Sequence, residues 1–322
     1  MIHSKIRGTG SYVPKMVVKN NDFTTYIETS DEWIASRTGI RERRYANDMG
    51  TIDMAYLASL EAIKSSGIDK SMIDLIIVAT VSADNVFPGV SQMLQAKLDL
   101  EPIMAFDVNA ACSGFIYAMN IADKMIQSGA YSHALVVGAE ALTKWTDFRD
   151  RNTCVLFGDA AGAMIISKSD QVGLVDVISK AQGDVDDLLI CKNPKPKTLE
   201  RYEGEVQDFI HMDGRNVFKF ATTVLVSTVH ELLERNHMTL DEIDYIVCHQ
   251  ANKRIIDKAS RDLDFSLDKM YLNISRYGNT SAASVPLAID EAIRKNKIKK
   301  GDTFMTIAFG GGLTWAGALV KY

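Results

Sequence analysis

The chain has 322 residues, of which 47% are hydrophobic and 24% are charged. This balance is typical of a globular protein and excludes a disordered chain, which cannot bury enough apolar surface to offset the entropy cost of ordering. The 36 Lys and Arg against 41 Asp and Glu give a net charge of −5. Because binding to phosphates requires clustered positive charge, this balance argues against nucleic acid as the main partner.

The N-terminal segment and the apolar runs predict a cytoplasmic protein. Lys5 and Arg7 interrupt the first ten residues, and no apolar core of a secretory signal follows them. The longest apolar stretch, residues 75–81, is far shorter than the roughly 20 residues that span a bilayer. The four cysteines lie at positions 112, 154, 191 and 248 without any C-x-x-C spacing, which indicates reduced thiols rather than a redox or zinc motif.

Strand-like and helix-like runs alternate along the chain. Short apolar runs are typical of strands, and apolar residues at i, i+3 and i+4 are typical of helices. The alternation predicts an α/β fold in which helices cover a largely buried sheet. In chain order, the sequence predicts a helix over 54–65, strands over 76–81 and 103–108, a helix over 115–127, and strands over 134–137 and 154–157.

The chain also repeats itself weakly. Residues 73–78 resemble residues 243–248, which lie 170 positions further along. A strand enclosed by two glycines recurs after 172 positions. The order and offset of these matches predict two halves of similar topology, residues 1–170 and 171–322, which share one interface.

Residues 181–207 form the least regular segment. They include three aspartates at 184, 186 and 187, and the run Lys-Asn-Pro-Lys-Pro-Lys at 192–197. The prolines oppose a continuous helix or strand. A solvated loop is the simpler interpretation, and a loop that covers a substrate is the alternative.

Cys112 is a candidate nucleophile because of its position. It follows the strand that ends at Val108 and precedes the helix that ends near Gly129. The unpaired amides and the dipole of a helix N-terminus favour the thiolate, which is the nucleophilic form of cysteine. A buried structural thiol is the alternative interpretation.

His249 and Asn279 also lie at element boundaries. His249 directly follows the apolar run 245–248, and catalytic groups gather at the carboxyl ends of strands in open α/β sheets. Asn279 precedes a run of small residues and can donate an amide N–H to a developing oxyanion without titrating. Taken alone, a packed core histidine and a turn before a helix are the simpler interpretations.

The glycine-rich segments do not match nucleotide-binding motifs. Residues 310–312 are three glycines that can bring backbone N–H groups near a ligand, but no Gly-Lys-Ser/Thr follows them. Residues 8–13 lack the third glycine of a dinucleotide fingerprint, and Pro14 follows instead of a helix. These departures argue against an NAD-dependent oxidoreductase.

Taken together, the motifs resemble the β-ketoacyl-acyl-carrier-protein synthase III family of thiolase-fold condensing enzymes. The resemblance implies a thiolase-like αβαβα five-layered fold of two similar halves with mixed five-stranded sheets, and a homodimer. Residues 1–170 would carry the nucleophilic cysteine, and residues 171–322 the histidine and asparagine. The motifs lie at residues 31–40 (DEWIASRTGI), 110–115 (AACSGF), 157–162 (FGDAAG), 249–252 (HQAN), 278–284 (GNTSAAS) and 309–315 (FGGGLTW).

By this resemblance, Cys112, His249 and Asn279 are the catalytic residues. Cys112 takes the acyl group of a short acyl-CoA, and the backbone N–H groups of Cys112 and Gly311 hold the oxyanion. His249 and Asn279 stabilise the enolate that forms when malonyl-acyl-carrier protein loses CO₂, and this carbon attacks the acyl-cysteine. No metal or redox cofactor is implied, since acyl-CoA is a substrate. Elongating relatives use Cys-His-His, so Asn279 fits an initiating enzyme.

The resemblance also implies the residues that bind the substrate. Trp33 and Arg151 would sandwich the adenine of CoA, with Arg37 near its phosphates and Asn252 beside the pantetheine arm. Phe87 would reach across the dimer to close the acyl pocket of the partner. Departures from the family pattern at Asn152, Ala160 and Ala316 and in the loop 181–207 leave the choice of primer open.

A basic helix after His249 is a candidate docking surface for the acidic carrier protein. Arg254, Lys258 and Arg261 fall at i, i+4 and i+7, on one face of a helix, while Ile255, Ile256 and Ala259 are expected to face the core. A solvated amphipathic face without a partner is the simpler interpretation.

Two other functions are compatible with parts of this sequence pattern. A relative with the same three catalytic residues could make a specialised metabolite from another primer or acceptor. A non-catalytic partner subunit of the same fold is a different class, and the retention of cysteine, histidine and asparagine argues against it.

Overall fold

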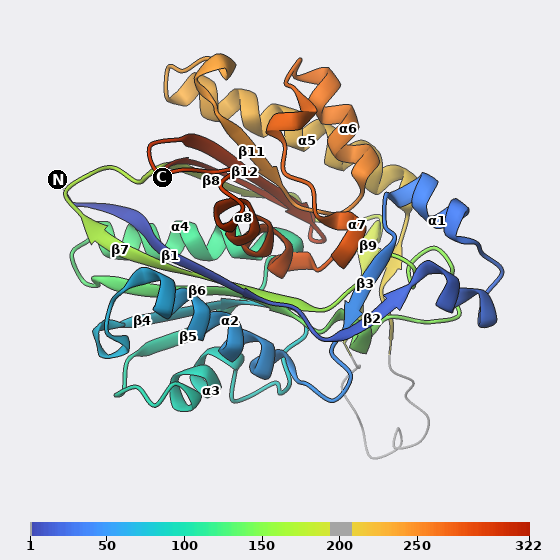
Figure 1. Cartoon of the computed structure of the whole chain (residues 1–322), viewed down its shortest axis with the longest axis horizontal. Helices are drawn as coiled ribbons and strands as arrows, with labels where there is room; N and C mark the ends of the chain where they lie inside the picture. The colour runs from blue at the N-terminus through green and yellow to red at the C-terminus, as the bar shows by residue number, and fades with distance from the viewer. Residues whose placement is uncertain (1, 194–207) are drawn as a thin grey trace.

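Two mixed β-sheets form the centre of the computed structural model, which describes residues 2–193 and 208–322 (Figure 1). The first sheet has the strand order β1-β7-β6-β4-β5, and the second has the order β11-β12-β13-β8. The first consists of β1 (His3–Tyr12), β4 (Leu75–Ala79), β5 (Met104–Val108), β6 (His133–Glu140) and β7 (Ala160–Ser169). The second consists of β8 (Leu174–Ala181), β11 (Tyr245–Cys248), β12 (Thr303–Gly310) and β13 (Thr314–Lys321). Two short ribbons pair β2 (Met16–Lys19) with β3 (Glu42–Tyr45) and β9 (Leu189–Ile190) with β10 (His211–Met212).

Helices form three layers around and between these sheets (Figure 1). The largest apolar cluster joins both sheets through α4 and α8, which therefore form the middle layer. A second cluster places α2 and α3 on the outer face of the first sheet, and a third places α5 and α6 on the outer face of the second. The helices are α1 (Asp31–Thr38), α2 (Thr51–Ser66), α3 (Val90–Lys97), α4 (Gly114–Gln127), α5 (Gly214–Arg235), α6 (Lys253–Asp262), α7 (Ile274–Tyr277) and α8 (Ser284–Arg294).

The burial of the central strands follows from this layering. Every residue of β4 is buried, because helices cover both faces of the sheet. The middle helix α4 is buried at Phe115, Ile116, Met119 and Ile126, since it packs between two sheets. Gly129 has φ +84 and follows the end of α4, as expected for the residue after a helix. Across the described ranges, no helix is both long enough and apolar enough to cross a membrane.

Two expectations about strands are wrong. Residues 151–156 form consecutive turns, because the amides of Thr153 and Cys154 donate to the carbonyl of Asp150 rather than to a neighbouring strand. The run 154–157 is apolar because it joins a buried cluster beside the sheets. The second sheet has four strands, not five, in the described part of the chain. Next to β11 there is only an isolated bridge between Ile246 and Met270, since the chain soon enters α7.

The internal repeat extends to the turns that precede the middle helices. The 3-10 turn η3 (Ala111–Ser113) precedes α4, and η7 (Ser281–Ala283) precedes α8, 170 positions later. Their first residues share a left-handed backbone, with φ 45 at Ala111 and φ 47 at Ser281. The strands of the first sheet all lie within residues 3–169 and those of the second within 174–321. The division at residue 170 stays a proposal.

Gly138 provides a test of how the two halves meet. A Cβ added at this residue of β6 would lie 2.3 Å from the carbonyl oxygen of Ala282 in η7. We expect Gly138→Ala to lower the free energy of unfolding by about 1–3 kcal/mol, because either β6 or η7 must move to make space for the added methyl group. Chemical denaturation measures this loss. Gly183→Ala is the control, since a Cβ there meets nothing within 4 Å; equal stability of both variants would contradict this account of the packing.

Candidate active site

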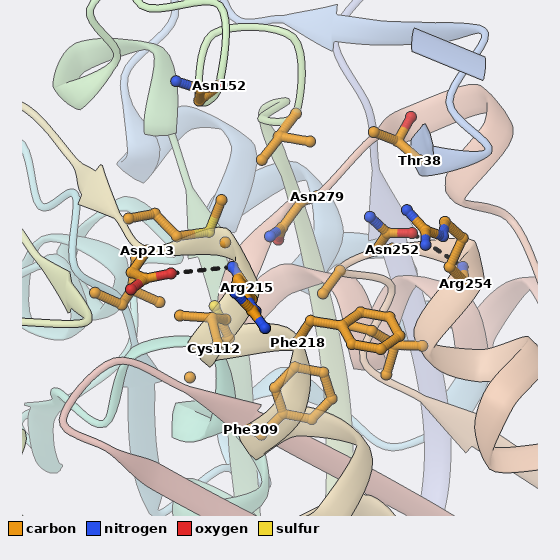
Figure 2. Close-up of a pocket in the computed structure, with 18 of the residues that line it drawn as sticks. Thr38, Cys112, Asn152, Asp213, Arg215, Phe218, Asn252, Arg254, Asn279 and Phe309 are labelled. Carbon is orange, nitrogen blue, oxygen red and sulfur yellow. Dashed lines mark hydrogen bonds between the residues drawn. The ribbon is translucent and has the colours of Figure 1, made fainter. Parts of the chain in front are cut away.

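A cavity of about 680 Å³ lies where η3, α1, α5 and α6 meet the ends of β11 and β12. Its lining includes Cys112, His249 and Asn279, so the structure brings the three expected catalytic residues together. Figure 2 shows Cys112 and Asn279 with Phe218 and Phe309 around the space between them.

Cys112 occupies the turn η3, directly before α4, as expected for a residue at a helix N-terminus. The residue is only 8% exposed. A Cβ added at Gly310 would lie 2.6 Å from the Cys112 nitrogen, so only glycine allows the end of β12 to approach this turn so closely. The end of β12, which lies in the C-terminal half of the chain, therefore packs directly against the turn that carries Cys112.

Burial dominates the protonation of Cys112. It raises the pKa of the thiol from 9.0 to about 12, although the Ser281 hydroxyl lowers it. The charge of Glu140, a buried carboxyl group at the end of β6, raises it further. Burial therefore opposes the thiolate that the helix N-terminus is expected to favour, and at this pKa the thiol is protonated at neutral pH.

His249 follows β11 and is 1% exposed. Its backbone N–H donates to the Ile307 carbonyl at 2.8 Å, and its ring lies edge-on to Phe309 with the ring centroids 5.4 Å apart. Its Nδ1 is 2.6 Å from the Ser284 hydroxyl oxygen. Burial lowers the pKa of His249 from 6.5 to about 3, so the imidazole is neutral at physiological pH.

Asn279 is oriented by two backbone contacts. The Ser281 N–H donates to its Oδ1 at 2.9 Å, which leaves the Nδ2 protons for a substrate. The Asn279 N–H donates to the Leu156 carbonyl at 2.8 Å, and Asn279 forms a bridge with Phe157. The segment that does not form the expected strand therefore positions Asn279.

The arrangement combines one thiol with two neutral side chains that can donate hydrogen bonds, and all three residues are buried. Donors placed where negative charge develops stabilise an oxyanion or enolate far better in such a site than in water. The chemistry that these groups support is acyl transfer through sulfur, followed by reaction of a carbonyl-stabilised carbanion.

Three of the residues expected to bind CoA form one stack at the cavity mouth. The Arg37 guanidinium carbon lies 5.0 Å from the Trp33 ring centroid, and that of Arg151 lies 4.7 Å from it. Arg151 also donates to the Glu28 carbonyl at 3.0 Å. Trp33 and Arg37 line the cavity. A flat base that enters between Trp33 and Arg151 must displace this contact.

Asn252 has a structural role in addition to the one expected. Its Oδ1 accepts from the Arg254 N–H at 2.9 Å and caps α6, while its Nδ2 donates to the Arg37 carbonyl at 3.1 Å. It thus joins α1 to α6 and lines the cavity as well. Gly311 follows Gly310 at the end of β12, and the adjacent Gly310 and Leu313 line the cavity.

The basic face of α6 is only partly free. Ile255, Ile256 and Ala259 are buried, which confirms the predicted core-facing side of this helix. Arg254 and Arg261 are exposed, and Arg254 lines the cavity mouth. Lys258, in contrast, pairs with Asp262 at 2.7 Å.

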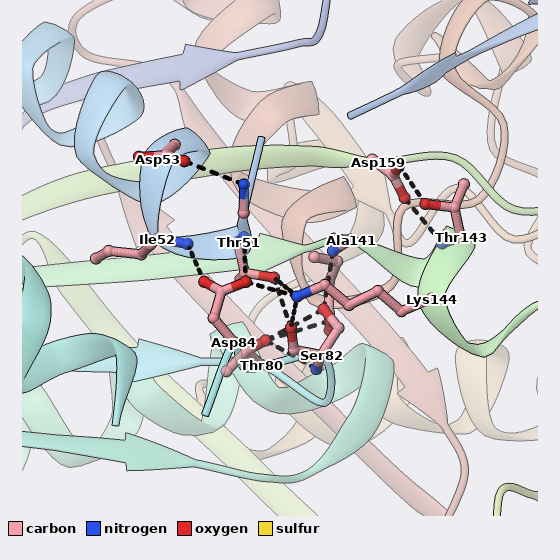
Figure 3. A network of polar contacts seen from close by, with 12 residues as sticks. Thr51, Ile52, Asp53, Thr80, Ser82, Asp84, Ala141, Thr143, Lys144 and Asp159 are labelled. Atoms are coloured by element: carbon pink, nitrogen blue, oxygen red, sulfur yellow. Dashed lines mark hydrogen bonds and ion pairs between the residues drawn. The ribbon is translucent and has the colours of Figure 1, made fainter. Parts of the chain in front are cut away.

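Phe87 projects from an anchored loop. It is 85% exposed, and Val86 beside it is 96% exposed. The loop before them is held by Lys144, whose Nζ lies 2.6 Å from Asp84 and 3.1 Å from the Ser82 carbonyl (Figure 3). Asp84 in turn accepts the first backbone N–H groups of α2. Neighbouring exposed apolar side chains, such as Val86 and Phe87 on this loop, are a feature of surfaces that contact another molecule.

One wall of the cavity was not predicted. It comes from the β9-β10 ribbon and the start of α5, where Asp213 accepts from the Arg215 and Asn216 N–H groups (Figure 2). The signal was the Asp-Gly pair at 213–214, a typical helix N-cap. Leu189 also lines the cavity, so the irregular segment contributes to the wall; its Lys-Pro run at 194–197 lies outside the described residues. The unpredicted residues of this wall are Leu189, Met212, Asp213, Gly214, Arg215, Val217, Phe218 and Phe220.

Comparison with known proteins agrees with this geometry. Residues 106–183 match the family described as 3-oxoacyl-[acyl-carrier-protein (ACP)] synthase III, and residues 233–322 match its C-terminal part. The β-ketoacyl-[acyl-carrier-protein] synthase III 1 of Vibrio cholerae is 47% identical over 100% of both chains. The β-ketoacyl-[acyl-carrier-protein] synthase III of Clostridium acetobutylicum is 46% identical, over 99% of this chain and 98% of its own.

The solved structures give the same result. The crystal structure of 3-oxoacyl-[acyl-carrier-protein] synthase III from Aquifex aeolicus has a TM-score of 0.93 and 41% identity, and covers 99% of this chain and 100% of its own. The thiolase-like αβαβα fold expected from the motifs is thereby confirmed. The chain belongs to the β-ketoacyl-acyl-carrier-protein synthase III family of acyltransferases.

Proposed function

We propose that this chain is the initiating condensing enzyme of type II fatty acid synthesis. The observation that carries the proposal is that a single cavity holds the Cys112 thiol together with His249 and Asn279, two neutral side chains. The same cavity continues to the Trp33 and Arg37 pair at its mouth. A long substrate arm can therefore enter from the surface and present a thioester to the thiol.

In the first half-reaction, Cys112 sulfur attacks the carbonyl carbon of a short acyl-CoA. The thioester C–S bond to CoA breaks, and the thiol proton leaves with CoA as its free thiol. Backbone N–H groups of Cys112 and Gly311 hold the oxyanion of the tetrahedral intermediate. Trp33 and Arg151 receive the adenine, Arg37 lies near the phosphates, and Asn252 lies beside the pantetheine arm.

In the second half-reaction, malonyl-acyl-carrier protein loses CO₂. His249 and Asn279 donate to its thioester carbonyl and stabilise the enolate. The enolate carbon attacks the acyl group on Cys112, the C–S bond to Cys112 breaks, and the released sulfur takes up a proton from water. The product is a 3-oxoacyl-carrier protein. Neutral donors suit this step, because no proton has to be taken up or released by His249.

No metal or redox cofactor takes part in these steps, since the CoA thioester supplies the activated acyl group and loss of CO₂ generates the carbanion. We place the reaction in the cytoplasm. We also propose a homodimer in which Phe87 closes the acyl pocket of the partner. Phe87 is exposed, and the loop that precedes it is anchored by the ion pair between Lys144 and Asp84.

A synthase of specialised metabolism with another primer or acceptor is the second candidate. The relatives that are 46–47% identical over the whole chain bear the name of the fatty acid enzyme, which supports the first candidate. Assays with primers of different size and malonyl-carrier protein separate the two.

The separation of the two half-reactions tests the proposed function. Incubation with radiolabelled acetyl-CoA or a short branched acyl-CoA is expected to label the wild-type protein and not Cys112→Ser. His249→Ala and Asn279→Ala are expected to accept the acyl group, while malonyl decarboxylation falls by roughly 10²–10³, the usual cost of one oxyanion donor. Labelling of Cys112→Ser at the wild-type level, or undiminished decarboxylation in both alanine variants, would contradict these roles.

Phe87 is expected to control the size of the primer. Phe87→Thr should shift the preference towards longer or bulkier acyl chains, because the partner's pocket loses an aromatic wall. Competition between acyl-CoAs of different length measures this shift. Val86→Thr is the matched control, since Val86 is also a highly exposed apolar residue of this loop. A monomer by sedimentation, or the same primer profile in both variants, would refute the assignment.

The basic residues of α6, exposed Arg254 and Arg261 and the partly buried Lys258, are expected to guide the carrier protein. Arg254→Glu combined with Lys258→Glu should raise the KM for malonyl-carrier protein at low salt and change acylation by acyl-CoA far less, because rim charges act mainly on association. Added salt should narrow the gap to wild type. Lys299→Glu with Lys300→Glu is the charge-matched control, at the opposite end of β12. Equal losses in both half-reactions would overturn the docking surface.

A further inference from the structure

Ser284 is a buried serine that contacts the catalytic histidine from the first turn of α8. The residue is 1% exposed. Its hydroxyl oxygen has two hydrogen-bond partners among the described residues, the His249 Nδ1 at 2.6 Å and the Gln250 backbone N–H at 3.1 Å. Ser284 is the last residue of the motif 278–284, but the sequence assigned it no role and did not indicate these contacts.

The hydroxyl proton of Ser284 can be assigned by counting donors and acceptors. The Gln250 N–H only donates, so it occupies a lone pair of the Ser284 oxygen. The one acceptor among the partners of Ser284 is Nδ1 of His249, provided that Nδ1 carries no proton. If Nδ1 were protonated, the serine oxygen would accept two hydrogen bonds and its own proton would be buried without a partner, which costs about 1–3 kcal/mol.

We propose that Ser284 is a positioning residue that donates its hydroxyl proton to His249 Nδ1 and so holds the neutral imidazole with its proton on Nε2. Nε2 is then a hydrogen-bond donor towards the cavity and not a base. His249 acts on the carbonyl oxygen of the malonyl thioester and does not take the proton of Cys112. This inference rests on the proposed function and adds the protonation state that the second half-reaction requires.

The backbone donor that orients Ser284 is itself held firmly. The Gln250 side chain is buried and donates through Nε2 to the carbonyls of Cys248 and Tyr271, at 2.8 and 3.0 Å. Its Oε1 accepts from the backbone N–H groups of Asn273 and Ile274, at 3.0 and 3.2 Å. The Gln250 side chain therefore fixes this residue to the end of β11 and to the start of α7. Its backbone N–H occupies one lone pair of the Ser284 oxygen, which leaves the hydroxyl proton for the imidazole.

The neutrality of His249 is a condition of this assignment, and the Ser284 contact then decides which ring nitrogen carries the proton. Burial lowers the pKa of the imidazole to about 3, so at physiological pH one ring nitrogen carries a proton and the other does not. A serine hydroxyl neither adds charge nor raises this pKa strongly, whereas a carboxylate on Nδ1 would favour imidazolium. Ser284 thus orients the ring and leaves it neutral, which matches the neutral amide of Asn279 beside it.

The test combines ¹⁵N NMR of the histidine side chains with kinetics of the two half-reactions. In protein labelled with ¹⁵N-histidine, the His249 signals, assigned by their loss in His249→Ala, are expected to show protonated Nε2 and unprotonated Nδ1. In Ser284→Ala, the two tautomers are expected to mix. The kcat of malonyl decarboxylation should fall at least about tenfold in this variant, which is less than the roughly 10²–10³ lost when a whole hydrogen-bond donor is removed. The rate of acylation of Cys112 should change less than about twofold. Ser284→Thr, which retains a hydroxyl, should restore decarboxylation.

Ser59→Ala is the matched control. Ser59 is also fully buried in a helix, and its hydroxyl donates to the Ala55 carbonyl at 2.7 Å, far from His249 in sequence and layer. It reports the general cost of removing a buried hydroxyl, and both half-reactions are expected to keep their wild-type rates in it.

Each outcome decides the matter. A wild-type spectrum with the proton on Nδ1 overturns the inference without any variant. The inference can therefore be tested even if the Ser284→Ala protein fails to fold. Equal decarboxylation in Ser284→Ala and wild type also overturns it. Absence of both half-reactions in the wild-type protein instead refutes the proposed function, while the spectrum still decides the tautomer.

Discussion

The geometry of the site depends on two close backbone contacts between the halves. The turn η3, which carries Cys112, lies on Gly310 at the end of β12, and the turn η7 lies on Gly138 in β6. Each contact joins a turn of one half to a strand of the other, and each leaves no space for a Cβ. Because interiors are packed as densely as crystals, these contacts determine where the nucleophile and the residues after Asn279 can lie.

This packing has an electrostatic consequence. Burial raises the pKa of the Cys112 thiol and lowers that of His249, so the free site holds neutral groups. In the proposed mechanism, charge appears only during reaction, first on the oxygen of a tetrahedral intermediate and then on an enolate. Preorganised N–H donors stabilise such charge without reorganising at the moment of reaction. The contacts of Ser281 with Asn279 and of Ser284 with His249 would provide that preorganisation.

The periphery has a different character from the centre. The Trp33 stack, the exposed tip at Phe87 and the arginines of α6 lie at or near the surface. In the function proposed for this chain, these peripheral residues select the acyl group and the carrier protein, and the three buried groups in the centre carry out the chemistry. Under that proposal, substrate preference can change without a change in mechanism.

The sequence by itself determined the family, the layered α/β architecture, and the positions of Cys112, His249 and Asn279 at the ends of strands or starts of helices. These features depend on local patterns: apolar periodicity, helix caps and short motifs. Only the tertiary structure decided that residues 154–157 are turns supporting Asn279 and that the β9-β10 ribbon and α5 complete the cavity wall. It also brought the Ser284 hydroxyl to His249, 35 positions away in the chain. Burial of the thiol likewise came from packing, because the charge state of a side chain depends on what surrounds it in space, and the order of residues along the chain does not contain that distance.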